Sequence, residues 1–350
     1  MAPTILDRYP QIGDAWRNRW DSLRVFTPAK YDGLPGMRFP APRLSFPTKD
    51  QVADYMAAYA AKFKLPVRNG VDVESIKRGG GRFVLSTSAG TFEADNVIVA
   101  TGARHTPKTP AFSSELSTEI TQIHSSAYKN PGQLRDGAAL VVGVGNSGSE
   151  ISYDLRNGRH VYLSGSPTAE MPGSGGAMAA AFLLPVLKFV GTHLLTLDTP
   201  MGRKVLPKMR THATPLIRLK LKDLEASGIE RVARVAGVSE GRPVLADGRT
   251  LDVTNVIWCT GFRSNFGWID VPDAFGPDGR SMEYRGVVAS QPGLYFVGLD
   301  FQYSAVSDVL PGVGRDAAYV VKQLVGRPVL NRVDAEHGMV RRDAAELIVG

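Results

Sequence analysis

The feature that most constrains the fold is a glycine-rich loop at Gly143–Gly148, with the spacing Gly-x-Gly-x-x-Gly. An apolar run, Ala138–Val142, precedes the loop, and a helix-like segment, Ser149–Leu155, follows it. A second apolar run, His160–Leu163, comes next. Strand, glycine turn, helix and strand in this order are typical of a doubly wound α/β domain that binds a dinucleotide. The sequence therefore predicts one such domain here.

The three glycines of this loop each have an expected physical role. Gly143 permits a tight turn, Gly145 lets backbone N–H groups approach a pyrophosphate, and Gly148 allows close packing of the helix. The helix N-terminus adds a favourable potential for the anion. The alternative, a glycine-rich turn without a ligand, is disfavoured by the flanking strands and helix.

The end of the second apolar run indicates which nicotinamide dinucleotide binds. NAD sites usually carry an acidic residue there for the ribose 2′-hydroxyl group. This chain has no acid at that point, and Ser164 and Ser166 are suited to hydrogen-bond a 2′-phosphate. We therefore predict NADPH rather than NADH. Arg203 and Lys204 are candidates for the positive charge that the strand end lacks.

An internal repeat is the second strong feature. Thr91–Gly102 and Thr250–Gly261 are identical at six of twelve positions and lie 159 positions apart. Each is an apolar strand that ends in Thr-Gly, at Thr101-Gly102 and Thr260-Gly261, where we expect backbone to lie against a bound dinucleotide. The six shared positions disfavour the alternative of two unrelated buried strands. The sequence thus predicts two dinucleotide domains built on one plan.

The offset between the repeats predicts how the N-terminal domain begins. The counterpart of Ser166 is Asp7, which ends a short apolar run, Thr4–Leu6, as a ribose-binding acid would. The counterpart of Gly143 falls before Met1. We therefore expect this domain to begin at its second strand, without its first strand, glycine loop and first helix.

Composition and charge exclude several classes of function. Hydrophobic residues make up 43% and charged residues 21%, so the chain can bury a core. Cys259 is the single cysteine, which excludes a Cys-x-x-Cys redox pair and a multi-cysteine zinc site; we predict no metal and interpret Cys259 as a buried, inert thiol. The net charge of +7 suits anionic small molecules, and no nucleic-acid motif is present. No secretory signal is visible, so we expect a cytoplasmic protein.

Two apolar segments raise separate questions. Residues 177–197 are strongly apolar but contain Pro185 and Lys188, so we predict no membrane-spanning helix. We favour a helix packed in the protein, with a helix at a membrane surface or substrate pocket as the alternative. Thr48–Lys64 is predicted to be an amphipathic helix that begins with a capping box. Its core face would comprise Val52, Tyr55, Tyr59 and Phe63.

Several further motifs together resemble those of a known family. They are Gly13–Arg17, Asp21–Pro28, His124–Lys129, the glycine loop, Cys259–Phe262 and Gly293–Gly298. The chain resembles the NADPH- and FAD-dependent flavoprotein monooxygenases of the flavin-containing monooxygenase type, and among them the YUCCA-like and bacterial CzcO-like branch. It departs from the family at Thr118 and Ile120, where the fingerprint has Phe and Gly, and in lacking the first glycine loop, which would hold the FAD pyrophosphate. Of a late-assigned start codon, a fragment and weak FAD binding, we favour the truncated start.

The resemblance implies an α/β fold with two Rossmann-like dinucleotide-binding domains, the NADPH domain inserted in the FAD domain. Residues 1–130 and 290–350 would form the FAD-binding domain, and residues 131–289 the NADPH-binding domain. The implied enzyme is an oxidoreductase with the cofactors FAD and NADPH. NADPH would reduce FAD, and reduced flavin with O₂ would give a flavin hydroperoxide that oxygenates a small N-, S- or carbonyl-containing substrate. A homodimer is compatible with the sequence.

The resemblance also assigns residues to the cofactors. Asn146 and Ser147 would join the loop glycines in holding the NADPH phosphates, and Asp7 would bind the FAD ribose. The remaining residues expected at FAD are Gly13, Trp16, Arg17 and, at the start of a helix-like run over 317–324, Gly312 and Gly314. His124 is the one catalytic candidate, but we interpret it as ordering the loop that joins the domains. No catalytic side chain is assigned, because the flavin would carry the reaction.

Two other functions stay open at this point. A flavin reductase or NADPH oxidase would use the same domains without oxygenating a substrate. A degenerate, non-enzymatic protein would retain NADPH or nothing, as the absent FAD loop would suggest. The motif at His124 favours the monooxygenase.

Overall fold

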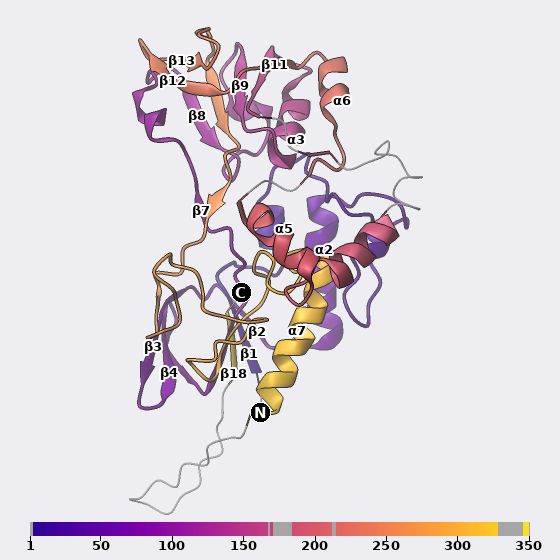
Figure 1. The fold of residues 1–350 in the computed structure, drawn as a ribbon, viewed down its shortest axis with the longest axis vertical. Coiled ribbons are helices and arrows are strands. Elements are labelled where there is room, and N and C mark those ends of the chain that lie inside the picture. Colours follow the sequence, from indigo (N-terminus) through magenta and orange to yellow (C-terminus); the bar gives the residue numbers. More distant parts are fainter. Residues whose placement is uncertain (1–2, 167–168, 171–183, 212–214, 328–345, 350) are drawn as a thin grey trace, which may run out of the picture.

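The computed structural model of the chain describes residues 3–166, 169–170, 184–211, 215–327 and 346–349. Figure 1 shows two lobes along the long axis of the molecule, which we call the upper and the lower lobe. Each lobe is built on a five-stranded sheet.

The sheet of the upper lobe is wholly parallel, in the order β11-β10-β9-β14-β8. Its strands are β8 (Thr121–His124), β9 (Ala139–Val142), β10 (Val161–Ser164), β11 (Glu230–Val232) and β14 (Asn255–Trp258). All four residues of β9 and of β14 are buried, because helices or loops cover both faces of a parallel sheet. This requirement explains the uninterrupted apolar runs in the sequence.

The sheet of the lower lobe is also wholly parallel, in the order β17-β6-β18-β1-β2. Its strands are β1 (Pro3–Asp7), β2 (Val67–Asn69), β6 (Asn96–Val99), β17 (Leu294–Phe296) and β18 (Glu346–Val349). We expected this sheet to lack its first strand; in the structure, the place beside β1 is filled by a strand from the C-terminal part of the chain. β18 lies between β1 and β6 and pairs with both, so the edges of β1 and β6 that face each other are hydrogen-bonded through β18.

Helices and smaller sheets cover these two sheets. In the upper lobe they are η2 (Ala111–Glu115), η3 (Pro131–Gln133), α3 (Asn146–Leu155), α6 (Leu221–Ala226) and the hairpin of β12 (Val235–Ser239) and β13 (Arg242–Leu245). In the lower lobe they are α1 (Asp14–Arg17), η1 (Ala29–Tyr31), α2 (Lys49–Phe63), α7 (Leu310–Val325) and a sheet of β16 (Ile269–Asp270), β3 (Val73–Gly79), β4 (Arg82–Thr87) and β5 (Gly90–Ala94).

The two lobes are joined by a crossing of two short strands. β7 (Thr106–Pro107) pairs antiparallel with β15 (Phe262–Arg263). β6 leads into β7, and β14 leads into β15, so the carboxyl ends of both large sheets run toward this crossing (Figure 1). Ligands of open α/β sheets bind outside the carboxyl ends of the strands. The architecture therefore points both binding edges toward the middle of the molecule.

Two helices test the sequence predictions directly. α2 begins with the predicted capping box, in which Gln51 N donates to Thr48 Oγ1 at 3.2 Å. Its apolar face is buried at Val52 and Tyr55, whereas Phe63 at its end is 41% exposed, so the predicted core face is too long. α7 begins at Leu310, before the predicted start, because Pro311 suits the first turn of a helix.

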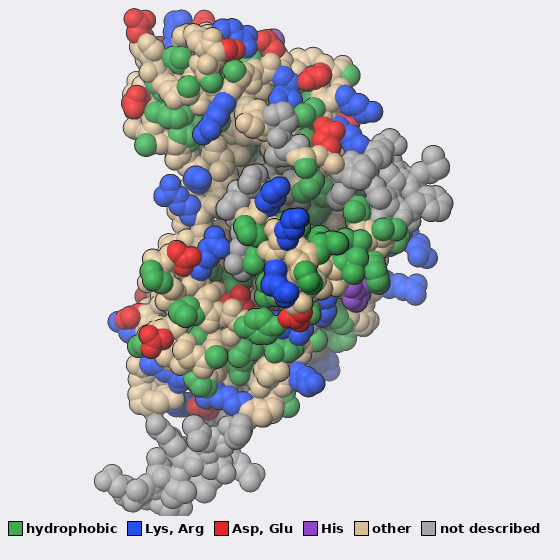
Figure 2. All heavy atoms as spheres, in the orientation of Figure 1, with side chains coloured by type: hydrophobic (Ala, Val, Ile, Leu, Met, Phe, Trp, Pro, Cys, Tyr) green, Lys and Arg blue, Asp and Glu red, His purple; other side chains and the backbone are tan. Residues whose placement is uncertain are grey.

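The apolar segment at 177–197 lies partly outside the described residues. From 184 onward it forms a helix over 184–189 and a π-helical turn, η4 (Val190–Leu194), followed by α5 (Pro200–Thr211). Val186 and Phe189 are more than half exposed, so this part is not the packed helix we expected. Figure 2 shows hydrophobic side chains gathered over α5 and its neighbours, with Lys and Arg among them. Within the described ranges, no helix has the length and apolarity needed to cross a membrane.

Candidate functional site

The glycine loop has the geometry that the sequence predicts. Gly143 follows β9 with φ +117°, and a Cβ atom there would lie 2.4 Å from Cys259 O. A Cβ atom on Gly148 would lie 1.8 Å from Gly143 O. Gly145 is the extended N-cap residue of α3, which begins at Asn146. Both flanking glycines are therefore required by close backbone contacts, and the loop brings a helix N-terminus to the carboxyl edge of the upper sheet.

The side chain of Asn146 has structural partners. Its Nδ2 donates to Pro215 O at 3.1 Å, and Ile217 N donates to its Oδ1 at 3.3 Å. Nearby, Arg218 Nη1 donates to Glu150 Oε2 at 2.9 Å and also to Oε1. Burial raises the pKa of Glu150, and the guanidinium of Arg218 opposes that rise. These contacts fasten α3 to residues 215–218 and engage both polar atoms of the Asn146 amide.

The two serines predicted to meet a 2′-phosphate differ in position. Ser164 is fully buried; its Oγ donates to Ala233 O at 2.9 Å and accepts from Val235 N at 3.0 Å. Ser164 is therefore a structural residue, which corrects the prediction, since its hydroxyl anchors the chain before β12. Ser166 is exposed. Arg203 and Lys204 are exposed on α5, which lies between the lobes in Figure 1.

The two Thr-Gly turns of the repeat have matching conformations. Gly102 and Gly261 have φ +75° and φ +83°, which favour glycine. A Cβ atom on Gly261 would meet nothing within 4 Å, and one on Gly102 would meet only Gly298 O, at 4.0 Å. Thr260 Oγ1 donates to Lys108 O in the crossing, and Thr101 Oγ1 lies 3.1 Å from His105 Nε2. Both turns thus have open space beside an exposed backbone.

His124 links the end of β8 to the crossing. Its Nε2 lies 3.1 Å from Gly261 O and its Nδ1 lies 2.9 Å from Ser126 Oγ. The ring meets that of Phe262 edge-on at 5.1 Å, and burial lowers the pKa of His124. This geometry agrees with an ordering role at the junction between the lobes. His105 lies between β6 and β7, where Asn265 N donates to its Nδ1 at 3.0 Å; sequence reasoning did not identify it.

Cys259 follows β14 and packs against the glycine loop. A Cβ atom on Gly143 or on Gly148 would lie 3.5 Å from the Cys259 Cβ. Burial raises the pKa of the Cys259 thiol to about 12, so it is protonated at neutral pH. Its part is to fill space behind the loop.

The residues expected at FAD gather at the carboxyl edge of the lower sheet and around α1. Asp7 is the last residue of β1. Tyr9 N donates to Asp7 Oδ1 at 3.0 Å, and burial raises the pKa of Asp7. Gly13 has φ +94°, and a Cβ atom there would lie 2.6 Å from Ala53 O in α2. Trp16 packs against two core clusters. Arg17 donates to Asp14 and Asp54, so its guanidinium holds α1 to α2.

The two glycines predicted to open the last helix lie within the first turns of α7. A Cβ atom on Gly312 would lie 1.9 Å from Val306 O, so this position requires glycine. Gly314 faces the loop at residues 33–36, where its Cβ would lie 3.9 Å from Pro35 Cγ. The N-terminus of α7 therefore packs against a loop of the lower lobe.

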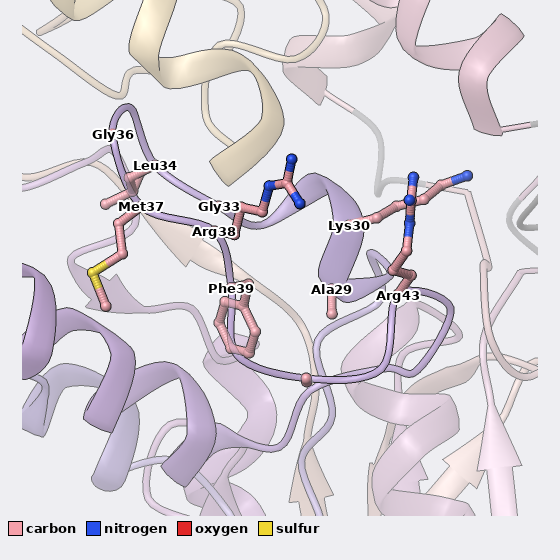
Figure 3. A pocket seen from close by; sticks show the side chains of 10 residues that line it. Ala29, Lys30, Gly33, Leu34, Gly36, Met37, Arg38, Phe39 and Arg43 are labelled. Carbon is pink, nitrogen blue, oxygen red and sulfur yellow. The ribbon is translucent and has the colours of Figure 1, made fainter.

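That loop lines a cavity that sequence reasoning did not identify. The cavity has a volume of about 560 Å³ and is lined by Ala29, Lys30, Gly33, Leu34, Gly36, Met37, Arg38, Phe39, Ala41 and Arg43. Three of these residues are cationic and none is acidic. Figure 3 shows the Arg38 side chain extending toward a neighbouring helix and the Lys30 and Arg43 side chains lying together on the other side. The cavity thus combines an apolar floor with a positive potential.

A buried carboxyl group lies next to the cavity-lining residue Gly33. Asp32 is fully buried, and Thr27 Oγ1 donates to its Oδ1 at 2.5 Å. Among the described residues no hydrogen bond reaches Oδ2. Burial raises the pKa of Asp32 to about 7.

Comparison with known proteins places this geometry among flavoenzymes. Residues 2–170 match the family model of pyridine nucleotide-disulphide oxidoreductases. An uncharacterized CzcO-like oxidoreductase of Geobacillus kaustophilus is 36% identical over 92% of this chain and 90% of its own length. The indole-3-pyruvate monooxygenase YUCCA1 of rice (Oryza sativa subsp. japonica) is 31% identical over 92% and 85%. A flavin-containing monooxygenase from Stenotrophomonas maltophilia has the same fold, with a TM-score of 0.70 and 23% identity over 93% of this chain and 98% of that one.

Proposed function

Because this chain belongs to the flavin monooxygenase-type oxidoreductases, in their CzcO-like and YUCCA-like branch, we propose that it is an NADPH- and FAD-dependent monooxygenase of a small molecule. The observation that carries the proposal is the convergence of two parallel sheets on one crossing. The carboxyl ends of β6 and β14 both lead into the β7–β15 pair, so ligands at the two edges lie on facing sides of the junction.

NADPH binds at the edge of the upper sheet. Backbone N–H groups at Gly145, Asn146 and Ser147 would hold its pyrophosphate, because they lie at the N-terminus of α3, where the helix dipole favours an anion. Ser166, which is exposed just beyond β10, would contact the 2′-phosphate. Gly261 leaves its backbone open on the same edge.

FAD binds at the edge of the lower sheet, which has the features that an FAD nucleoside requires. Asp7 presents a half-buried carboxylate at the end of β1 for the ribose hydroxyls. Gly102 and Gly298 have open space where a dinucleotide backbone passes. When bound, FAD supplies hydride acceptance and oxygen chemistry. The protein would orient the cofactor, and the buried His124 fixes the end of β8 against Gly261 at the junction of the lobes.

The cavity at residues 29–43 favours an organic acid as the substrate. Lys30, Arg38 and Arg43 would hold a carboxylate, and Phe39 with Leu34 would contact its apolar part. The rice relative is named for indole-3-pyruvate, a substrate that carries both a carboxylate and a carbonyl group. We propose a carbonyl-containing acid as the substrate class.

The test is an assay of the purified chain supplied with FAD. We expect FAD to co-purify with the protein, and NADPH and O₂ to be consumed together as an acid that carries a carbonyl group is oxygenated. A protein that yields only peroxide with all acids, amines, thioethers and ketones would be an NADPH oxidase. A protein that takes up no flavin would be the non-enzymatic alternative.

A further inference from the structure

The two large sheets have the same strand plan, and the repeat fixes how they correspond. β6 and β14 are the strands of the repeated segments, and they lie in equivalent positions of their sheets. β1, which ends at Asp7, corresponds to β10, which ends at Ser164. One strand lies between these two in each sheet: β9 in the upper lobe and β18 in the lower lobe. β18 therefore has the position of the strand that carries the glycine loop.

The strand registers agree residue by residue. Asn255 of β14 pairs with Ala139 of β9, and its repeat partner Asn96 pairs with Glu346 of β18. At the other end, Trp258 pairs with Val142, and Val99 pairs with Val349. The match extends to the sequence, where Ala345–Gly350 reads Ala-Glu-Leu-Ile-Val-Gly and Ala138–Gly143 reads Ala-Ala-Leu-Val-Val-Gly.

β18 is packed as a core strand on both of its faces. Val349 is 3% exposed and lies in the core cluster that includes Leu6 and Phe296. Ile348, on the opposite face, packs with the cluster of Tyr295 and Val320 under α7. Its backbone is also engaged at the carboxyl edge, since Ala100 N donates to Val349 O at 2.6 Å.

We infer that Glu346–Val349 is the central dinucleotide-binding strand of the lower sheet, the counterpart of β9, so that the FAD site is assembled from both ends of the sequence. The strand directions support this assignment. All five strands are parallel, so β18 ends at the same edge as Asp7 and Thr101-Gly102. Figure 1 shows the C-terminal end of β18 near the middle of the molecule, facing the crossing. The inference rests on the proposed function for the identity of the ligand, but the placement of β18 does not.

Disulfide formation between β1 and β18 tests the placement of β18 without any cofactor. Ile5 pairs with Ile348, so the Ile5→Cys/Ile348→Cys variant should form an intramolecular disulfide under mild oxidation. Its matched control, Ile5→Cys/Val349→Cys, puts the two thiols on opposite faces and should form none. Peptide mapping by mass spectrometry identifies the bond and separates it from Cys259. Equal yields in both variants, or no bond in the first, would overturn the placement.

FAD titration of the same variants then tests the role of the strand. We expect the oxidised Ile5→Cys/Ile348→Cys protein to bind FAD as tightly as its reduced form, because the locked strand is part of the site. Removal of residues 346–350 should weaken FAD binding at least tenfold and leave NADP⁺ binding unchanged. If the shortened chain does not fold, the FAD titration of the oxidised Ile5→Cys/Ile348→Cys variant is sufficient. Unchanged FAD binding would support the inference, and loss of FAD binding on oxidation would contradict it, because it would mean that β18 blocks the site. A full chain that forms the disulfide but never binds FAD would refute the ligand and the proposed function, not the placement.

Discussion

Thr27 donates a 2.5 Å hydrogen bond to Asp32, a carboxyl group with no exposure to solvent. Burial raises the pKa of Asp32 from 3.8 to about 7, so the folded protein holds a proton that the unfolded chain releases near pH 4. The free energy of unfolding should therefore fall as the pH rises from about 4 to about 7, by roughly 2 to 4 kcal/mol.

Asp32→Asn should remove this pH dependence. Asparagine keeps an oxygen acceptor for Thr27 and has no proton to lose, so the variant should equal the parent near pH 4 and exceed it in stability at pH 8. Urea unfolding at both pH values measures the difference. Identical pH profiles for the two proteins would show that Asp32 is ionised in the fold.

Gly148→Ala should disrupt the upper binding edge. The added Cβ would lie 1.8 Å from Gly143 O, so the loop or α3 must shift. We expect a loss of about 1–3 kcal/mol in stability and at least tenfold weaker NADP⁺ binding by calorimetry. Gly158→Ala is the matched control, because its Cβ would meet nothing within 4 Å. Equal effects of the two changes would contradict the assigned role of the loop.

Alanine substitutions at Ser164 and Ser166 should distinguish a structural role from a role in cofactor preference. Ser164→Ala leaves the buried N–H of Val235 without its acceptor and should cost about 1–3 kcal/mol in thermal or urea unfolding. Ser166→Ala should leave stability within about 0.5 kcal/mol and raise KM for NADPH but not for NADH. If Ser166→Ala changes neither KM, the 2′-phosphate is bound elsewhere.

Arg38→Ala should weaken the binding of acidic substrates only. Removing a charged partner of a carboxylate costs about 1.5–3 kcal/mol, which corresponds to a KM increase of roughly ten- to a hundredfold. A neutral ketone should show no change, and Lys222→Ala, on the distant α6, should affect neither substrate. Steady-state kinetics with one acid and one ketone suffice. A parallel loss for both substrates would point to damage of the loop.

His124 should behave as a neutral structural residue. Its pKa is lowered below the ordinary 6.5 by burial, so protonation favours the unfolded chain as the pH falls below 6.5. The protein should therefore lose stability below that pH relative to His124→Asn, while the pH profile of kcat stays the same in both. A shift in the kcat profile would instead give His124 a part in proton transfer.

The sequence predicted what depends on neighbouring residues and missed what depends on distant ones. The glycine loop was predictable because its glycines have a fixed spacing between an apolar run and a helix-like segment, although the close contact that makes glycine necessary at position 143 is with the distant Cys259 O. The true role of Ser164 was not, because its partners, Ala233 and Val235, meet it only in the folded sheet. The basic cavity also escaped notice, since its cations are scattered over one loop without a repeat or motif.

The strand β18 was not predicted for a different reason. Its sequence signal was present, because Ala345–Gly350 matches Ala138–Gly143 in four of six positions. The offset of 159 placed the missing strand before Met1, and the assumption that the two domains run in the same order hid a match at the other end. Comparing the glycine-loop strand with the whole chain would have found it.

The pairing of residues 3–6 with residues 346–349 has a consequence for synthesis. One edge of β1 has no neighbour until the ribosome has added residues 346–349, whereas β9, β10 and β14 are all complete about 90 residues sooner. The upper lobe can thus fold while translation continues, and the lower lobe closes last, over a loop of maximal length that makes its formation slow. During that interval the bare edge of β1 is open to pairing with another strand, and a chaperone that shields nascent chains would protect it.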